Sequence, residues 1–175
     1  MDQSTLNTLG RHLQAMRQAK GLSLSQLAAG AGIAKSNLSR LEQGNGNPTL
    51  DTIWRLAMQL NVPFGALVHP LSGSVGEAGV EVKLIDQGKD KPNVDAYWMS
   101  VAPNTRREAE AHATGTQETI TVISGTLEAG NIGSTQLLLP GQSIAFSADL
   151  PHVYKTQDEW VTCLITIVYH KEAIK

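Results

Sequence analysis

The chain has 175 residues, of which 41% are hydrophobic, and it carries 14 basic and 16 acidic side chains with a single cysteine. This size and composition fit one or two compact domains. One cysteine excludes a disulfide framework and a cysteine-based zinc cluster, and no run approaches the roughly 18 consecutive apolar residues of a membrane span. The first residues are polar and acidic, so we expect no secretory signal peptide and a cytoplasmic protein.

The charge is distributed unevenly along the chain. Residues 1–70 carry six basic and three acidic side chains, a net charge of +3, whereas residues 71–175 have a net charge of −5. A basic segment beside an acidic one is compatible with a polyanionic partner for the first segment only. A charge of +3 is equally ordinary for a solvated helical surface, so both interpretations stay open at this point.

The first part of the chain shows helical periodicity. Apolar residues at steps of three and four predict a first helix, from about Leu6 to just before Lys20. Ser23 followed three places later by Gln26 has the spacing of a capping box, so a second, short helix is predicted to begin there and to stop at Gly32.

A third helix is predicted over residues 35–43, with Leu38 and Leu41 on its inner side and an almost wholly polar outer face. A turn follows, then a fourth helix capped by Thr49 and a last short helix over residues 63–68. These elements predict a five-helix bundle.

From Pro70 the composition changes. Residues 71–79 are small, rich in glycine and serine and without periodicity, which is typical of a flexible linker. Short segments of β character follow, separated by turn signals, and they predict an all-β sandwich or barrel. The predicted strands are residues 80–85, 96–101, 118–123, 126–129, 136–139, 143–146 and 161–169.

The second and third predicted helices have the features of a DNA-reading unit. Two short helices joined by a tight turn containing glycine, with the second helix polar on one side, suit insertion into the major groove. Asparagine and arginine are the side chains that bind adenine and guanine through two hydrogen bonds. The polar side chains of the third helix are Lys35, Ser36, Asn37, Ser39 and Arg40.

The pattern from Gly21 to Leu50 resembles the λ-repressor-like (Xre-type) helix-turn-helix domain, with a dense match over about residues 6–68. The sequence departs from the family pattern at Leu24, where glutamine is common, and at Ala34, where a hydroxyl side chain usually caps the third helix. An alternative is a helical bundle that binds only protein. The DNA-binding residues implied by the resemblance are Ser23, Gln26, Lys35, Ser36, Asn37, Ser39, Arg40, Asn45 and Asn47.

In the acidic part, His112, Glu118 and His152 are the candidates for metal ligation. Two histidines and one carboxylate can form a zinc or non-haem iron site, provided that the fold brings them together. Their spacing, with Gly125 and Gly141, resembles the two motifs of cupins over roughly residues 80–170. The resemblance implies a double-stranded β-helix, or jelly-roll, barrel.

The cupin resemblance is incomplete. Thr114 stands where metal-binding cupins have a second histidine, and Arg106 stands where the first motif opens with glycine; Ser147, Asp149 and Thr156 replace the proline, glycine and asparagine usual in the second motif. Three of four ligands remain, so the site is expected to hold either one divalent ion such as zinc or iron, with lowered affinity, or a ligand without metal. A third reading makes both histidines hydrogen-bonded core residues.

A barrel of this size has room for one small ligand, selected by inward-pointing polar groups. The two aromatic candidates for the lining are equally compatible with core packing, and Arg107 with a solvated charge cluster. Cys163 lies in an apolar run and is expected to be a buried small hydrophobe rather than a nucleophile. The predicted effector-binding residues are Trp98, Arg106, Arg107, His112, Thr114, Gln117, Glu118, His152 and Tyr154.

We therefore expect an α+β chain with a helix-turn-helix DNA-binding domain at residues 1–70, a flexible linker at 71–79 and a cupin domain at 80–175. This combination resembles bacterial one-component transcriptional regulators. The resemblance implies a homodimer that binds a double-stranded DNA operator and responds to an amino acid, a polyamine or a sulfur metabolite. Two alternatives remain: a metal-dependent cupin enzyme tethered to DNA, and a β domain that only dimerises the DNA-binding head.

Overall fold

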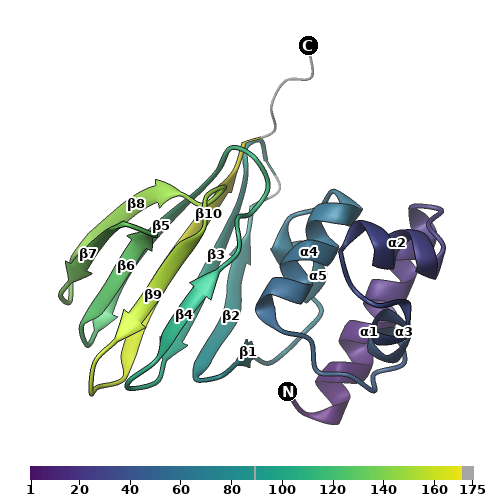
Figure 1. Cartoon of the computed structure of the whole chain (residues 1–175), viewed down its shortest axis with the longest axis horizontal. Helices are drawn as coiled ribbons and strands as arrows, with labels where there is room; N and C mark the ends of the chain where they lie inside the picture. Colours follow the sequence, from purple (N-terminus) through teal and green to yellow (C-terminus); the bar gives the residue numbers. More distant parts are fainter. Residues whose placement is uncertain (89, 171–175) are drawn as a thin grey trace. The chain divides into compact units, whose positions relative to one another are not determined.

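The computed structural model describes residues 1–88 and 90–170, which form five helices and ten strands (Figure 1). They divide into two compact units, the first comprising Met1–Val75 and the second beginning at Gly76. The α+β, two-domain fold class expected from the sequence is confirmed. The end of the expected cupin domain, residues 171–175, lies outside the described residues.

The first unit is an all-helical bundle. Its apolar side chains are spaced so that each helix buries one face, and the second and third helices are short, as the sequence predicts. The helices are α1 (Gln3–Ala19), α2 (Leu24–Gly30), α3 (Lys35–Glu42), α4 (Leu50–Leu60) and α5 (Phe64–Val68). Its most deeply buried side chains include Leu13, Leu27, Leu38, Ile53, Leu56, Leu60 and Leu67.

Polar side chains at the helix starts fix the boundaries of this bundle. The predicted capping box of α2 is present, because the Ser23 hydroxyl accepts from the Gln26 amide and the Gln26 side chain accepts from the Ser23 amide. Thr49 caps α4 as predicted, by accepting a hydrogen bond from the backbone amide of Thr52. Each such cap stabilises its helix by about 1 kcal/mol.

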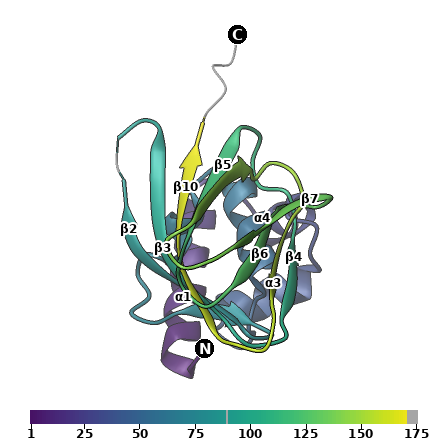
Figure 2. The ribbon, with the colours of Figure 1, turned by 90° about the vertical axis from the view of Figure 1, so that its left-hand side faces the viewer.

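The second unit consists of two antiparallel sheets. One has six strands in the order β1-β2-β3-β10-β5-β8, and the other has four in the order β4-β9-β6-β7. In Figure 2 they lie face to face, with β2, β3, β10 and β5 on one side and β4, β6 and β7 on the other. The strands are β1 (Val75–Glu77), β2 (Val80–Gln87), β3 (Asn93–Val101), β4 (Arg106–Ala109), β5 (Thr116–Ser124), β6 (Leu127–Asn131), β7 (Ser134–Leu138), β8 (Ser143–Ser147), β9 (His152–Thr156) and β10 (Val161–Tyr169).

The connectivity of the last eight strands is that of a jelly roll. Counted from β3 to β10, one sheet takes the first, eighth, third and sixth strands, and the other takes the second, seventh, fourth and fifth. Cupins share this double-sheet architecture. The barrel that the sequence predicts is therefore present, with β1 and β2 extending one sheet beyond β3.

Three strands were not predicted: β1, β4 and β9. Each is short, and β4 is mostly charged while β9 follows a proline and begins with histidine, so neither shows a clear alternation of apolar and polar residues. β1 lies inside the expected flexible linker, where Glu77 forms an ion pair of 2.7 Å with Arg107. The structure thus differs from the prediction over residues 75–77, which pair in a sheet.

Within the described residues, no helix combines the length and the apolar character needed to cross a lipid bilayer.

Candidate nucleic-acid interface and buried histidine site

The α3 helix presents a polar surface and buries the opposite one. Leu38 and Leu41 are buried against the bundle, whereas Lys35 and Asn37 are exposed. Ser36 and Arg40 are also exposed, and Ser39 is half-buried. The side chains that the sequence assigns to DNA reading therefore stand, apart from Ser39, on the solvent side of α3.

A groove of about 330 Å³ runs beside this polar surface. It is bordered by Asn37 and Arg40 of α3, by the loop residue Asn47, and by Thr49 and Thr52 at the start of α4. The Arg40 guanidinium donates from Nη2 to a backbone carbonyl of the loop, that of Asn45, at 3.1 Å. The groove thus brings together three of the predicted DNA-binding side chains, Asn37, Arg40 and Asn47.

The two predicted DNA-binding residues at the start of α2, Ser23 and Gln26, lie outside this groove and bond to each other's backbone. The side chains of Ser23 and Gln26 bond each other's backbone amides at 3.2 and 2.8 Å, and both residues are exposed. Their side chains are therefore held by the capping box, and the Gln26 side-chain amide retains its N–H donors.

A buried ion pair fixes α3 within the bundle. Arg17 of α1 donates to Glu42, the last residue of α3, from Nε at 2.6 Å and from Nη2 at 2.8 Å. Its Nη1 donates to the carbonyl of Leu22, just before α2, at 2.8 Å. Only 10% and 4% of the Arg17 and Glu42 side chains are exposed. One guanidinium thus links α1, the start of α2 and the end of α3.

The N-terminus of α3 lacks a side-chain cap. Ala34 occupies the cap position with the extended backbone of a cap residue, φ −64° and ψ 138°, but it has no side-chain oxygen. We expect Ala34→Ser to raise the free energy of unfolding by about 0.5–1 kcal/mol, because serine can accept from an amide of the first turn. Urea denaturation measures this change.

Ala29→Ser provides the control for Ala34→Ser. Ala29 is equally exposed but lies within α2, where serine is a poorer helix former than alanine. A gain in stability from Ala29→Ser equal to that from Ala34→Ser would contradict the capping explanation.

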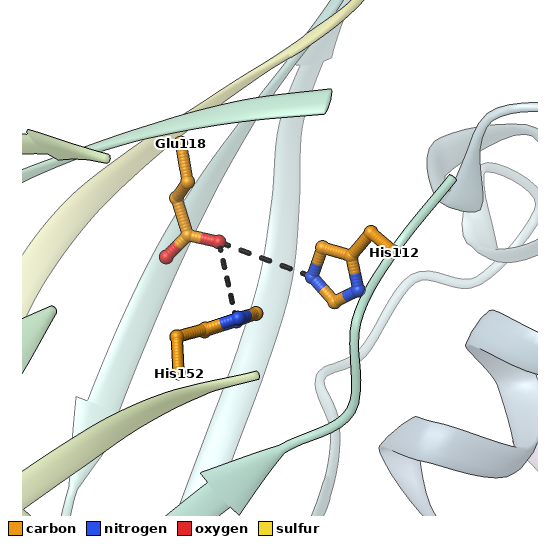
Figure 3. A group of neighbouring side chains, drawn as sticks. All are labelled: His112, Glu118 and His152. Carbon is orange, nitrogen blue, oxygen red and sulfur yellow. Dashed lines mark ion pairs between the residues drawn. The ribbon is translucent and has the colours of Figure 1, made fainter. Parts of the chain in front are cut away.

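The second site lies inside the jelly roll, where His112, Glu118 and His152 converge (Figure 3). His112 lies between β4 and β5, Glu118 on β5 and His152 at the start of β9, so both sheets contribute. The Glu118 Oε2 is 4.0 Å from His112 Nε2 and 3.9 Å from His152 Nε2. All three side chains are buried, and together they form a group that could hold a metal ion.

The hydrogen bonds around His152 determine which of its nitrogens is available. Its Nδ1 lies 2.9 Å from the carbonyl oxygen of Leu150, which can only accept, so Nδ1 carries the proton of this bond. Nε2 is fully buried and has no hydrogen-bond partner within residues 1–88 and 90–170. In the neutral ring its lone pair therefore faces the Glu118 carboxylate, and a cation between these two acceptors would satisfy both. This second-shell arrangement is typical of metal-ligating histidines.

Burial changes the proton affinities of this group. It lowers the pKa of His112 well below its usual range, and the neighbouring His152 lowers it further. Burial also raises the pKa of Glu118, although the charge of His152 and a hydrogen bond of 2.6 Å from the Tyr154 hydroxyl act in the opposite direction. The low proton affinity of His112 favours the neutral imidazole, which is the form that ligates metals.

Comparison with known proteins agrees with the two-unit organisation. The Helix-turn-helix family model matches residues 13–67. The HTH-type transcriptional regulator SutR of Escherichia coli is 29% identical over 93% of this chain and 94% of its own length. The uncharacterized HTH-type transcriptional regulator y4dJ of Sinorhizobium fredii is 37% identical over 31% of this chain and 70% of its own length. The chain belongs to the HTH-type transcriptional regulators.

A solved structure extends the likeness of this HTH-type regulator to the whole chain. The crystal structure of an HTH_3 family transcriptional regulator from Vibrio cholerae has a TM-score of 0.87 and 22% sequence identity. It covers 98% of this chain and 100% of that chain. At this identity the likeness establishes the shared fold, from the helical bundle through the jelly roll.

Four of the expected effector-binding residues of the regulator lie away from the barrel interior, contrary to prediction. Trp98 is 41% exposed on β3, and Gln117 is exposed on β5. Their strand neighbours Tyr97 and Glu118 are buried, and alternate residues of a strand face opposite sides of the sheet. The other two, Thr114 and Arg106, are exposed, so Thr114 does not replace the missing histidine ligand.

The remaining expected residues include the interior group. His112, Glu118, His152 and Tyr154 are buried together, and Arg107 is half-buried in its ion pair with Glu77. Sequence reasoning missed Thr116, whose buried hydroxyl has no hydrogen-bond partner within the described residues. The signal that could have found it is its position two residues before Glu118 on the same strand face.

Two further interior features concern side chains with titratable groups. Asp95, fully buried on β3, accepts hydrogen bonds from the hydroxyls of Tyr97 at 2.6 Å and Tyr169 at 2.8 Å, and the sequence does not predict these contacts. Cys163 is buried as expected, and burial raises the pKa of its thiol to about 12. A thiol with so high a pKa is not a nucleophile at neutral pH.

Proposed function

We propose that this regulator binds a double-stranded DNA operator in a sequence-specific manner, and that a small molecule held inside its jelly roll tunes this binding. The observation that carries the proposal is the two-sided character of α3: one side is polar and exposed, and the opposite side buries Leu38 and Leu41. A helix of this kind can enter the major groove while its apolar side keeps it attached to the bundle.

Asn37 and Arg40 are the side chains proposed to read bases. Both border the same groove, and both carry the paired hydrogen-bonding groups that distinguish adenine and guanine. Lys35, Ser36 and Ser39 are proposed to add contacts to phosphates or base edges, and Asn45 and Asn47 contacts to phosphates. Because operators of this kind are read by two recognition helices about one DNA turn apart, we propose a homodimer as the binding species.

The proposed effector site is the interior group of the jelly roll. His112, Glu118, His152 and Tyr154 supply nitrogen and oxygen atoms to one buried region, as expected for a site that selects a small polar molecule. An effector changes operator binding only if it binds the DNA-competent and the incompetent state with different affinity. Amino acids, polyamines and sulfur metabolites are the classes to screen.

His112, Glu118 and His152 are further proposed to hold one divalent ion such as zinc or iron. Two imidazoles and a carboxylate suit either ion, and the buried Nε2 of His152 provides a lone pair that accepts no hydrogen bond from the described part of the chain. A bound ion would supply a fixed positive charge able to attract an anionic or carbonyl group of an effector. Two hydrogen bonds would keep the ligands oriented toward the ion: one from His152 to the carbonyl of Leu150, and one from the Tyr154 hydroxyl to Glu118.

We expect His152→Ala to lower the bound divalent metal at least about tenfold, because it removes a ligand, while affinity for operator DNA in the absence of effector stays within about twofold. Elemental mass spectrometry of the purified protein measures the first effect, and fluorescence anisotropy of a labelled duplex measures the second. His69→Ala, at an exposed histidine of the helical unit, is the matched control. Full metal content in a folded His152→Ala protein would contradict the assignment.

The proposed DNA-binding function is tested by selecting bound duplexes from a random library. Fluorescence anisotropy then measures the affinity of the protein for the enriched duplexes at several salt concentrations. We expect a consensus with two half-sites, and an affinity that falls as salt rises because phosphate contacts release counterions. Absence of enrichment together with absence of binding at low salt would overturn the proposal.

A second candidate function, a metal-dependent enzyme, is favoured by one observation. Two histidines and one carboxylate are the ligand set of many non-haem iron oxygenases. Relatives matched over the helical unit or the whole chain carry the name of transcriptional regulators. Turnover of candidate metabolites by iron-loaded protein under oxygen, at rates lost in Glu118→Gln, would favour the enzyme.

A further inference from the structure

The outer surfaces of the two sheets of the jelly roll differ in charge. On the four-stranded sheet this surface carries ion pairs between Arg106 and Glu108 at 2.5 Å and between Lys155 and Glu128 at 3.1 Å. Such a charged surface is typical of a sheet that faces water. The six-stranded sheet has no comparable cluster on strands β3, β10, β5 and β8.

We call this second surface the uncharged sheet face. Strand register places its residues in continuous rows, one of which runs from Trp98 through Leu164 and Thr121 to Ser143. All its members are exposed or half-buried, and none is charged. The uncharged sheet face comprises Val94, Ala96, Trp98, Ser100, Thr162, Leu164, Thr166, Val168, Gln117, Thr119, Thr121, Ser143, Ala145 and Ser147.

We propose that the uncharged sheet face is the surface through which two copies of this regulator dimerise, packed sheet against sheet about a two-fold axis. The inference rests on the proposed function, since it assigns a surface to the proposed homodimer. A two-fold interface uses the same patch on both subunits, so this patch must be complementary to a second copy of itself. A face without charges meets this requirement, because no like charges are brought together.

The size of the face suits such a dimer. Strands β3, β5 and β10 have 9 residues each, and β8 has 5. At about 3.3 Å per residue and about 4.8 Å between strands, four strands cover about 500 Å² per copy. Two copies would then bury about 1,000 Å², which is near the lower limit of specific interfaces.

Trp98 provides an anchor for this contact. It is 41% exposed, although its indole is apolar over most of its surface, and it lies next to Leu164 on β10. Exposed aromatic side chains are enriched in interfaces and carry much of their binding energy. Charged residues lie beyond it on the neighbouring strand β2, where Glu81, Lys83 and Asp86 are exposed and can form a polar rim.

The test compares arginine substitutions on the two outer sheet surfaces in the full-length protein. Trp98→Arg and Thr166→Arg each place two charges in the proposed interface, because the axis repeats them, and should weaken self-association at least about 100-fold. Leu137→Arg, at an apolar side chain of β7 that is 56% exposed on the four-stranded sheet, is the matched control. It should leave the dimer affinity within about threefold of the wild type, as for ordinary surface changes.

Sedimentation equilibrium over a concentration series measures self-association, and circular dichroism checks folding. Thr166→Arg keeps the test decisive if Trp98→Arg reduces folding. If the wild type is dimeric and both folded variants are equally dimeric, the proposed interface is wrong but the homodimer stands. Loss of the dimer in Leu137→Arg would overturn the interface in the same way. A monomeric wild type at all concentrations would overturn the proposed homodimer as well.

Discussion

Arg17→Ala is expected to destabilise the helical unit by about 3–5 kcal/mol, the cost of leaving a buried charge without its partner. The substitution removes both hydrogen bonds to Glu42, whose side chain is 4% exposed, and the bond to the carbonyl of Leu22. Since this pair fixes the end of α3, DNA affinity should fall with stability. Urea denaturation followed by far-ultraviolet circular dichroism measures the change.

Two further variants separate the ion pair from the general effect of removing an arginine. Arg11→Ala changes an exposed arginine of the same helix and should alter stability by less than about 0.5 kcal/mol. The double variant Arg17→Met with Glu42→Leu should recover most of the stability lost in Arg17→Ala, because it leaves no buried charge. A double variant as unstable as Arg17→Ala would contradict this account.

Arg40→Ala is expected to weaken operator binding by about 1–3 kcal/mol, or about 10- to 100-fold, and to relax base preference at one operator position. Arg40 is exposed on α3 beside Asn37, and its guanidinium donates one hydrogen bond to a loop carbonyl, so the change should not lower stability appreciably. Anisotropy titrations against the selected operator and single-base variants of it measure both effects.

Lys155→Ala is the control for the DNA measurement. It also removes one positive charge, but from the outer surface of the jelly roll, where Lys155 pairs with Glu128. Its operator affinity should match that of the wild type at equal salt. Unchanged binding by Arg40→Ala would remove Arg40 from the proposed reading surface, and equal weakening by both variants would indicate a general charge effect.

The helical unit was predictable from the sequence because its signals are local. The capping box at Ser23, the cap at Thr49 and the missing cap at Ala34 each depend on residues within three positions of one another. The Arg17–Glu42 pair was not predictable in this way, since its partners are 25 residues apart and charged residues are usually exposed.

The jelly roll was less accessible to sequence reasoning. Its interior group was identified from the spacing of two histidines and a glutamate, but the strand that carries His152 was missed because β9 is short and mixed in character. The side on which a residue lies follows from strand register, and one position of error reverses it. Sequence reasoning contains no strand register and places Trp98 and Gln117 in the interior, although their strands turn them outward.

The histidine site also bridges the two layers of the jelly roll. Glu118 belongs to the six-stranded sheet, whereas His152 belongs to the four-stranded one. An ion or metabolite bound to both residues would cross-link the two sheets of the barrel, and its binding free energy would add to the thermal stability of this unit. The melting temperature of the regulator thus becomes a reporter for candidate effectors, rising with their concentration before any gene target is known.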